Sequence, residues 1–485
     1  MTGRERKQRL LAGLLLTGAL FPPLPASADD LRSALAAAYN TNPTLQAQRA
    51  QQRATDEGVP LARANGLPSL TASASETEFV KQNPLSGSEL PRMLGANATL
   101  TVPVYSGGGV RNAIHAAETR VQAGKDDLRA TEGNVFAQAV AAYLDVMRTE
   151  AIVRLNKAQV DTLKFDLSMT SDRFQIGDLT RTDVAQSQSR LAVAQGNLRT
   201  AEANLVSARE TYIQIIGKPP ENLASPPPLT GLPASVEDAV GIALDNSPDL
   251  SGARQRAKAA GYDVSSARAS RLPKVSLFAD GNYTNYLGSL SFSNLAIDGI
   301  PQHYTAADVG VRATIPLYQG GGLSAQVRQA QAIENQAQEQ SIGTERAVIA
   351  QARSAWSTWK AANDVIADSQ IAVDSAQLSL EGVRAENSVG NRTVLDILNA
   401  EQELVNAQVT LVTARRNAYV AGFNLLVTMG RAQARDLGFE DAAIYDPDRH
   451  YQQARHTLWD WGEDPKTSPK STRTVDTPAQ SGSIP

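Results

Sequence analysis

The sequence predicts a mainly α-helical chain, built as a twofold repeat, that contributes four β-strands to a membrane β-barrel. Three observations support this fold class: the two halves of the 485 residues repeat each other, long stretches carry a 3.5-residue apolar period, and four segments alternate polar and apolar residues. Aromatic residues make up only 5% of the chain, which is few for one large globular core. Long helices that pair with one another bury a narrow seam instead.

Composition excludes several classes of function. The chain has no cysteine, which excludes disulfides, thiol catalysis and cysteine-bound metals. With 46 Lys and Arg against 50 Asp and Glu, nothing favours a nucleic acid as partner. The histidines at 115, 303, 450 and 456 are scattered, and no zinc-protease or serine-hydrolase motif occurs. We therefore expect no enzyme, no metal site and no cofactor.

Residues 1–28 have the pattern of a cleaved secretory signal. Four basic residues precede the apolar stretch from Leu10 to Leu20, and Ala26-Ser27-Ala28 fits the cleavage pattern. A membrane anchor is the alternative, but the apolar stretch is short and prolines follow it. No later stretch reaches the ~20 consecutive apolar residues of a spanning helix. The sequence thus predicts an exported chain that is either soluble outside the cytoplasm or enters a membrane through β-strands.

An internal repeat governs the organisation of the chain. Asn-Pro-Thr-Leu at 42–45 returns as Ser-Pro-Asp-Leu at 247–250, and Val-Pro-Val-Tyr at 102–105 returns as Ile-Pro-Leu-Tyr at 315–318. Each copy predicts a helix, two strands, a very long helix and a shorter helix. The expected divisions are a first repeat over 29–217, a Pro-rich connector over 218–235, a second repeat over 236–430, a C-terminal collar segment over 431–464 and a disordered tail over 465–485.

The helices of each copy are predicted to pair as coiled coils. In the shorter helix, a series of apolar residues with Ser187 among them follows a strict 3,4 spacing from Val184 to Tyr212, and an apolar series does so again from Ile397 to Leu425. This 3.5-residue period indicates a coiled-coil seam. The long helix from Val110 to Arg173 would extend roughly 96 Å at 1.5 Å per residue. A rod of that length needs other helices to pack against.

Short loops are predicted to join the two helices of each pair into hairpins. Glycine at 177 and at 390 can adopt the positive φ that ends a helix, and a plain hairpin turn fully accounts for both glycines. The expected tip residues are Gly177, Asp178, Leu179 and Thr180 in the first copy, and Gly390, Asn391, Arg392 and Thr393 in the second.

Four segments alternate polar and apolar residues as membrane strands do: 67–80, 96–105, 274–286 and 306–318. A half-buried soluble sheet gives the same pattern, but the chain offers nothing large to cover such a sheet. Four strands cannot close a barrel, since single-chain barrels start at about eight strands. If these strands span a membrane, several chains must contribute to one barrel.

Glycine triplets follow one strand of each copy. They lack the Lys-Ser/Thr and the spacing of phosphate-binding loops, so a bend from strand to helix explains them better. The expected junction residues are Pro103, Tyr105 and Gly107 in the first copy, and Pro316, Tyr318 and Gly320 in the second.

Together, the exported repeat, the Asn-Pro near the start, the Pro-x-Tyr-x-Gly-Gly-Gly junctions and the Gly-x-x-Thr-x-x-Asp hairpins resemble the TolC-like outer membrane efflux protein family. The resemblance covers about residues 29–440. It implies a homotrimer in the Gram-negative outer membrane, with one twelve-stranded barrel continuous with a periplasmic α-helical tunnel. Such a duct is the exit of a tripartite multidrug efflux or type I secretion system. The implied partners are outer-membrane lipid, a periplasmic adaptor and an inner-membrane transporter of the RND or ABC type.

The resemblance also implies a gate near the hairpin tips. Thr182 and Asp183 match residues that the family links together on the first helix pair. Arg392 matches the family's arginine on the second pair. The alternative without a gate is that Arg392 and Asp396 form an i,i+4 ion pair on the surface, which stabilises the helix by only a few tenths of a kcal/mol.

A constriction is implied beside this gate. Asp396 matches the first of two ring-forming aspartates, whereas Asn399 stands where the second is found. Asn387 stands where a tyrosine often completes the lock. These two departures imply a less negative constriction and a differently held lock.

Two other functions remain as alternatives. A periplasmic adaptor, or membrane fusion protein, also uses exported helical hairpins, but usually one hairpin flanked by compact β-domains and a membrane anchor. A passive porin would need strands over most of the chain, whereas here they are a small minority.

Overall fold

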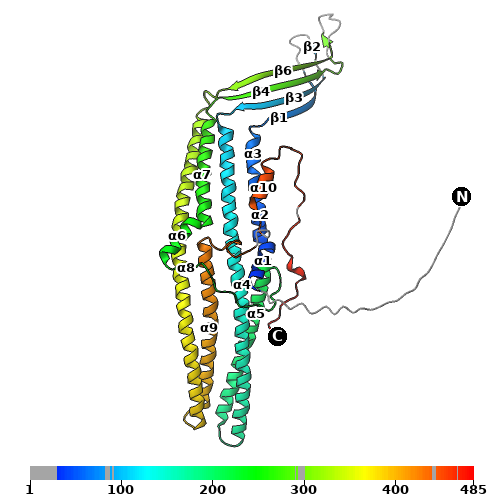
Figure 1. Cartoon of the computed structure of the whole chain (residues 1–485). Helices are drawn as coiled ribbons and strands as arrows, with labels where there is room; N and C mark the ends of the chain where they lie inside the picture. The colour runs from blue at the N-terminus through cyan, green and yellow to red at the C-terminus, as the bar shows by residue number, and fades with distance from the viewer. Residues whose placement is uncertain are drawn as a thin grey trace, which may run out of the picture.

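A computed structural model describes residues 30–81, 88–89, 92–289, 291–292, 301–439, 444–466 and 468–484 of the chain. The molecule is long, with a sheet at one end and two helical hairpins reaching to the other (Figure 1). The expected signal segment over 1–28 lies outside the described residues. No helix in the described part of the chain combines the length and apolar character needed to cross a membrane.

Both repeats contain the expected order of elements. The first comprises α1 (Leu31–Thr41), α2 (Pro43–Asp56), α3 (Gly58–Ala64), β1 (Ser69–Glu78), β3 (Arg92–Tyr105), α4 (Gly109–Gln175) and α5 (Arg181–Ile216). The second comprises α6 (Val236–Asn246), α7 (Pro248–Ala269), β4 (Lys274–Asn285), β6 (His303–Thr314), α8 (Gly322–Ser388) and α9 (Val394–Thr428). Further elements are the paired β2 (Ser88–Glu89) and β5 (Ser291–Phe292), α10 (Pro447–Ala454) and the 3₁₀ turn η2 (Thr474–Asp476).

The first predicted helix of each repeat is broken into shorter ones. The Asn42 carboxamide accepts hydrogen bonds from the backbone N–H groups of Thr44 and Leu45, so Asn42 caps α2. Pro43 occupies the first turn, where its missing N–H costs nothing. Ser247 and Pro248 repeat this arrangement before α7. The repeated Asn-Pro and Ser-Pro pairs therefore mark helix starts within a longer helical path.

Glycines turn the chain from strand to long helix in both copies. Gly107 and Gly108 have φ of 64° and 81°, and Gly320 and Gly321 have 57° and 81°. Glycine adopts this left-handed region without steric cost. Beyond the bends, α4 and α8 are each 67 residues long, which corresponds to roughly 100 Å.

The junctions of the two copies differ in detail. Pro103 and Tyr105 belong to β3, where the pairing with β4 shifts register between them. In contrast, β6 ends at Thr314, so Pro316 and Tyr318 lie beyond the strand, and the predicted strand over 306–318 ends four residues early. Thr314 pairs with Lys274, the first residue of β4, so no partner residue of β4 remains for Pro316.

The sheet has the order β1-β3-β4-β6, with every pair antiparallel, and its register separates an apolar face from a polar one. Leu70, Leu100, Ala279 and Val309 lie opposite one another across the four strands, so they share one face. One residue further along, the opposite face carries a polar row: Thr71, Thr99, Asp280 and Asp308. The alternation predicted from the sequence is confirmed, and the apolar face is open, since Leu70 is 72% and Val309 82% exposed.

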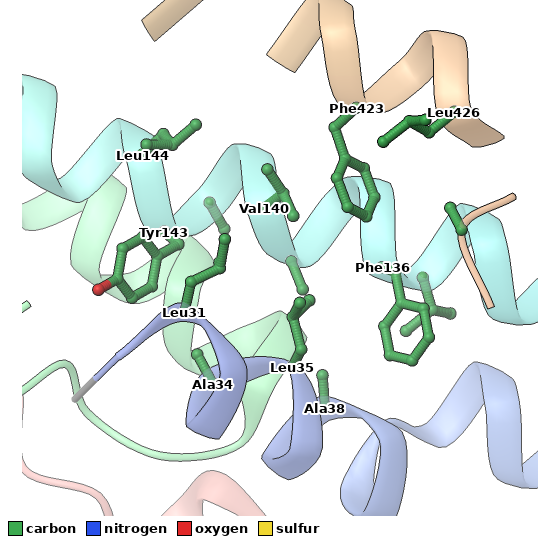
Figure 2. Packing of buried hydrophobic residues seen from close by; sticks show 14 of the residues in the cluster. Leu31, Ala34, Leu35, Ala38, Phe136, Val140, Tyr143, Leu144, Phe423 and Leu426 are labelled. Carbon is green, nitrogen blue, oxygen red and sulfur yellow. The ribbon is translucent and has the colours of Figure 1, made fainter. Parts of the chain in front are cut away.

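The hydrophobic core forms a belt around the middle of the molecule. Figure 2 shows Leu35 of α1, Phe136 and Tyr143 of α4 and Phe423 of α9 within one buried cluster. The Tyr143 hydroxyl donates a hydrogen bond of 2.6 Å to the backbone oxygen of Ala224, in the Pro-rich connector. The belt therefore joins both repeats and the connector, and the hairpins extend beyond it.

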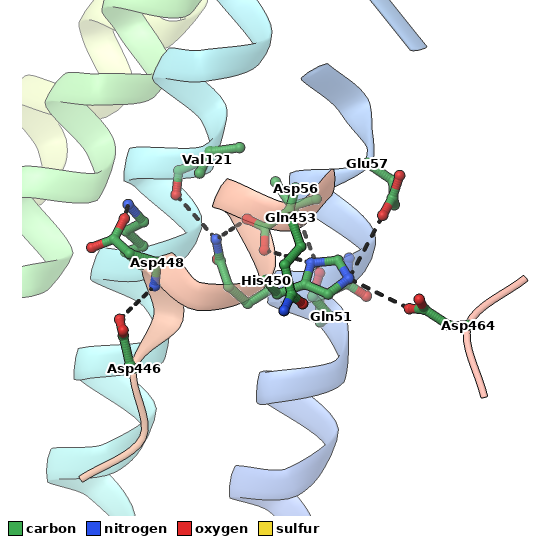
Figure 3. A network of polar contacts seen from close by, with 12 residues as sticks. Gln51, Asp56, Glu57, Val121, Asp446, Asp448, His450, Gln453 and Asp464 are labelled. Carbon is green, nitrogen blue, oxygen red and sulfur yellow. Dashed lines mark hydrogen bonds and ion pairs between the residues drawn. The ribbon is translucent and has the colours of Figure 1, made fainter. Parts of the chain in front are cut away.

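Through α10, the C-terminal segment packs beside α2 and α4 in a small cluster that is separate from this belt. His450 Nδ1 lies 3.0 Å from a carboxylate oxygen of the fully buried Asp56 of α2, as Figure 3 shows. Lys125 of α4 forms an ion pair with Asp448. The Gln52 side-chain amide donates to the other Asp56 oxygen at 2.8 Å.

The structure differs from the predicted disorder of the tail over its described residues, 465–466 and 468–484. Arg209 of α5 donates a 2.6 Å hydrogen bond to the backbone oxygen of Ser481, and the Gln480 N–H donates to Glu210 Oε1 at 3.1 Å. Ile484 packs against the core belt. The composition of the tail predicted disorder. It gave no sign of these contacts, because the partners lie some 270 residues away in the sequence.

Two glycines with similar backbone angles provide a test of packing at the end of the second repeat. Gly430 and Gly390 have φ of 70° and 81°, so alanine at either position incurs a left-handed strain of about 1–2 kcal/mol. A Cβ at Gly430 would also lie 2.3 Å from the backbone oxygen of Asn246, whereas a Cβ at Gly390 meets nothing within 4 Å. We expect Gly430→Ala to lower the free energy of unfolding by about 3 kcal/mol and Gly390→Ala by about 1 kcal/mol. Denaturant unfolding of the detergent-solubilised protein measures both, and equal losses would contradict this packing.

Candidate functional site: the hairpin ends

Both hairpin tips present apolar side chains to solvent. Gly177 and Gly390 have φ of 85° and 81°, and they end α4 and α8 as the sequence predicts. The residues just before them, Ile176 and Val389, are 80% and 70% exposed. In the first tip, Arg173 Nε donates a 2.7 Å hydrogen bond to Asp178, which closes the turn. The two tips are therefore similar, exposed and apolar at their ends.

The structure places two of the predicted gate residues in helix caps. Asp183 accepts hydrogen bonds from the Thr180 hydroxyl at 2.7 Å and from the Thr180 N–H at 2.9 Å. These two bonds lower the pKa of Asp183. Asp396 and Thr393 form the same capping box on α9, which lowers the pKa of Asp396. Within one chain, both carboxylates are thus held by the start of their own helix.

Three more of the predicted gate residues contact only their own hairpin or solvent within the described chain. Arg392 Nε donates to Glu386 Oε2 at 2.6 Å, and this hydrogen bond raises the pKa of the guanidinium. Asn387 Nδ2 donates to the backbone oxygen of Arg392 at 2.7 Å. Thr182 is exposed. The structure of one chain therefore does not bring Thr182, Asp183 and Arg392 into contact with each other.

Asn399 differs, because it links the two hairpins. Arg190 of α5 donates from Nη2 to Asn399 Oδ1 of α9 at 2.6 Å. Near it, Val160 and Leu163 of α4 and Ala194 of α5 form a small apolar cluster with Leu398 of α9. The two hairpins are therefore packed against each other here, apart from the belt.

A charged cluster that the sequence analysis missed also bridges the hairpins. Glu401 of α9 is only 2% exposed, and its Oε1 accepts a 2.6 Å hydrogen bond from Arg384 Nη2 of α8. The carboxyl group of Asp166 on α4 lies beside that of Glu401. Burial, followed by the charge of Asp166, raises the pKa of Glu401 to about 6.

One sequence signal could have found this cluster. Glu401 follows Ile397 by four residues and precedes Leu404 by three, so it lies on the apolar side of α9. A carboxylate at such a position needs a partner. Its partners Asp166 and Arg384 carry no such signal, because both belong to helices whose charged residues are numerous.

Within the residues that the structure describes, no group of three or more His, Asp or Glu side chains is arranged to hold a metal ion.

Comparisons with known proteins agree on one family. A family model described as "Outer membrane efflux protein" matches residues 34–218 and 239–431. Outer membrane efflux protein BepC of Brucella suis is 32% identical, with 93% of this chain and 95% of BepC covered. Outer membrane protein TolC of Escherichia coli is 28% identical, with 90% and 89% covered. The crystal structure of VceC from Vibrio cholerae superposes with a TM-score of 0.68 at 22% identity, over 82% of this chain and 96% of VceC, which supports the fold.

The apolar cluster between the hairpins can be tested with two leucines of one helix. Leu398 is buried in the cluster, whereas Leu395, one turn earlier on α9, is 37% exposed. Replacing a buried leucine by alanine costs about 2–5 kcal/mol, because apolar contact is lost and a cavity remains. We expect Leu398→Ala to speed amide hydrogen exchange in α5 and α9 near the tips, and Leu395→Ala to change it little. Similar exchange in both variants would argue against packing between the hairpins.

Proposed function

The chain belongs to the outer membrane efflux protein family, and we propose that three copies of it assemble into one duct fed by a periplasmic adaptor and an inner-membrane transporter. It is an efflux channel of the Gram-negative outer membrane, and its helices extend into the periplasm. Several relatives have names that refer to secretion or export, among them the alkaline protease secretion protein AprF of Pseudomonas aeruginosa. The matched family and relatives are outer membrane efflux and secretion proteins, which supports a duct and not the adaptor alternative.

The sheet supplies the observation that carries the trimer proposal. Its outer strands β1 and β6 each have one edge without a partner strand in the described chain. Since the order β1-β3-β4-β6 is antiparallel throughout, β1 and β6 run in opposite directions. The β6 edge of one copy can therefore pair antiparallel with the β1 edge of the next. Three copies joined in this way close a twelve-stranded barrel without edges, with the apolar row toward lipid and the polar row toward the lumen.

The hairpin tips are the proposed docking points for the adaptor. Ile176 and Val389 project at two tips that the internal repeat makes alike. A trimer of a twofold-repeated chain therefore presents a ring of quasi-equivalent apolar tips. An adaptor that recognises one tip through apolar contact can recognise the others too.

The gate residues have their proposed role between copies. In a threefold assembly each residue recurs three times around the axis, so Asp396 supplies three carboxylates and Asn399 three neutral amides. Arg392 and Asp183, which cap or pair locally within one chain, lie near the tips where neighbouring copies converge. The proposed duct is compatible with an inner-membrane transporter of either the RND or the ABC type.

A matched pair of arginine substitutions tests the barrel. Val309→Arg places a charge on the apolar face, which costs about 2–4 kcal/mol at the membrane midplane. Asp308→Arg introduces the same side chain on the opposite, polar face. We expect Val309→Arg to reduce the heat-modifiable oligomer in the outer-membrane fraction severalfold and Asp308→Arg to leave it near the wild-type level. Extraction of the wild-type chain by buffer without detergent, as a monomer, would support the adaptor alternative instead.

The gate assignment is tested by a double substitution. We expect Asp183→Ala with Arg392→Ala to raise the single-channel conductance of the purified protein in lipid bilayers, because links between hairpins of neighbouring copies are lost. Thr180→Ala removes the helix cap but keeps the Asp183 charge, so it separates the loss of the cap, worth about 1 kcal/mol, from the loss of the link. An unchanged conductance in the double variant would remove the gate role and leave the duct intact.

A further inference from the structure

Asp166 and Glu401 form an unusual contact between the two hairpins. Glu401 is buried, Asp166 is partly buried, and their carboxyl groups lie within hydrogen-bond reach of each other. Within the described chain, Asp166 Oδ2 and Glu401 Oε2 are shielded from solvent and have no donor. Two ionised carboxylates can only accept hydrogen bonds, so this contact lacks a hydrogen.

The charges around the pair are unequal. The charged groups that face it are Asp166 on α4, Arg384 on α8 and Glu401 itself on α9. On α5, the nearby Arg190 is bonded to Asn399 instead. Arg384 is half exposed and donates to Glu401 Oε1, which leaves Glu401 Oε2 and Asp166 Oδ2 without a donor in the described chain. The Arg384 guanidinium is thus the positive charge that acts on both carboxyl groups. A single proton would supply the hydrogen that Asp166 Oδ2 and Glu401 Oε2 lack.

We propose that Asp166 and Glu401 share one proton, and that this proton ties the two hairpins of each chain together near the periplasmic end of the duct. The inference rests on the proposed function. With the proton present, the Glu401 hydroxyl donates to the Asp166 carboxylate across the gap between α9 and α4. Without it, two negative charges from different hairpins repel each other in a partly buried site. Asp166 and Glu401 are therefore positioning residues for the closed end of the duct.

The direction of the pH effect follows from burial and from the neighbouring charge. Both raise the pKa of Glu401 from 4.5 to about 6, so the packed hairpins favour the protonated form. The stabilisation is fully present below pH 4.5 and is lost as the pH rises through about 6. Acid therefore tightens the link, and neutral pH loosens it. Asp183 and Asp396 do not contribute to a pH effect in this range, because their pKa values are lowered from 3.8 and both stay ionised.

Single-channel conductance of the purified full-length trimer, recorded between about pH 5 and about pH 7.5, provides the first test. We expect the wild-type conductance to rise with a midpoint near pH 6. Glu401→Gln carries a permanent donor, so it should keep the low conductance throughout. Asp166→Ala removes the acceptor, so it should give the high conductance throughout. Glu403→Gln, at an exposed site on the same helix, should keep the wild-type profile. Because histidines also titrate in this range, the comparison with Glu401→Gln identifies the group.

A second readout does not depend on conduction. The chain has no cysteine, so Lys164→Cys and Glu403→Cys allow two spin labels to be placed on α4 and α9 alone. The distance between the labels should increase from pH 5 to pH 7.5 in the otherwise wild-type chain and stay constant when Glu401→Gln is added. A distance that ignores pH, or a Glu401→Gln profile that follows the wild type, would overturn the shared proton. Absence of conductance at every pH, with the distance change retained, would instead overturn the proposed duct.

Discussion

The unpaired edges of a four-stranded sheet impose the main constraint on this molecule. Strands β1 and β6 leave backbone donors and acceptors open, and the apolar row that includes Leu70 and Val309 faces outward. Open strand edges are not tolerated in lipid unless other strands complete the sheet, whereas the apolar row suits a surface that faces lipid. The proposed assembly around a threefold axis would pair these edges and turn the apolar row toward lipid, and the same axis would arrange the long helices below the sheet into a tube.

The distribution of apolar contacts explains which parts of that tube are fixed and which can move. The belt around Phe136, Tyr143 and Phe423 joins both repeats, the connector and the C-terminal segment in the middle of the chain. Toward the tips, the contacts between the hairpins in the described chain are a small apolar cluster, an Arg190–Asn399 hydrogen bond and the Asp166–Glu401 contact. Local stability follows the density of buried contacts, so opening is least costly at the tips.

Polar residues near the tips divide into two kinds. Asp183 and Asp396 satisfy the first N–H groups of their own helices, which stabilises each hairpin whatever its neighbour does. Glu401 and Asn399 instead contact another hairpin, so their energy depends on how the hairpins are arranged. Within one chain, groups of the second kind are therefore the ones whose energy changes with the packing between the two hairpins.

The sequence alone determined the repeat, the helix pairs, the glycine bends and the faces of the strands, because each follows from spacing within a few residues. The 3,4 spacing in α9 fixes its buried side, and the alternation in β6 fixes which face carries Val309. Only the tertiary structure decided that the tail lies along α5 and that Asp166 meets Glu401. These contacts join residues more than 200 positions apart, and side chains at that distance become neighbours only once the packing of whole helices is settled.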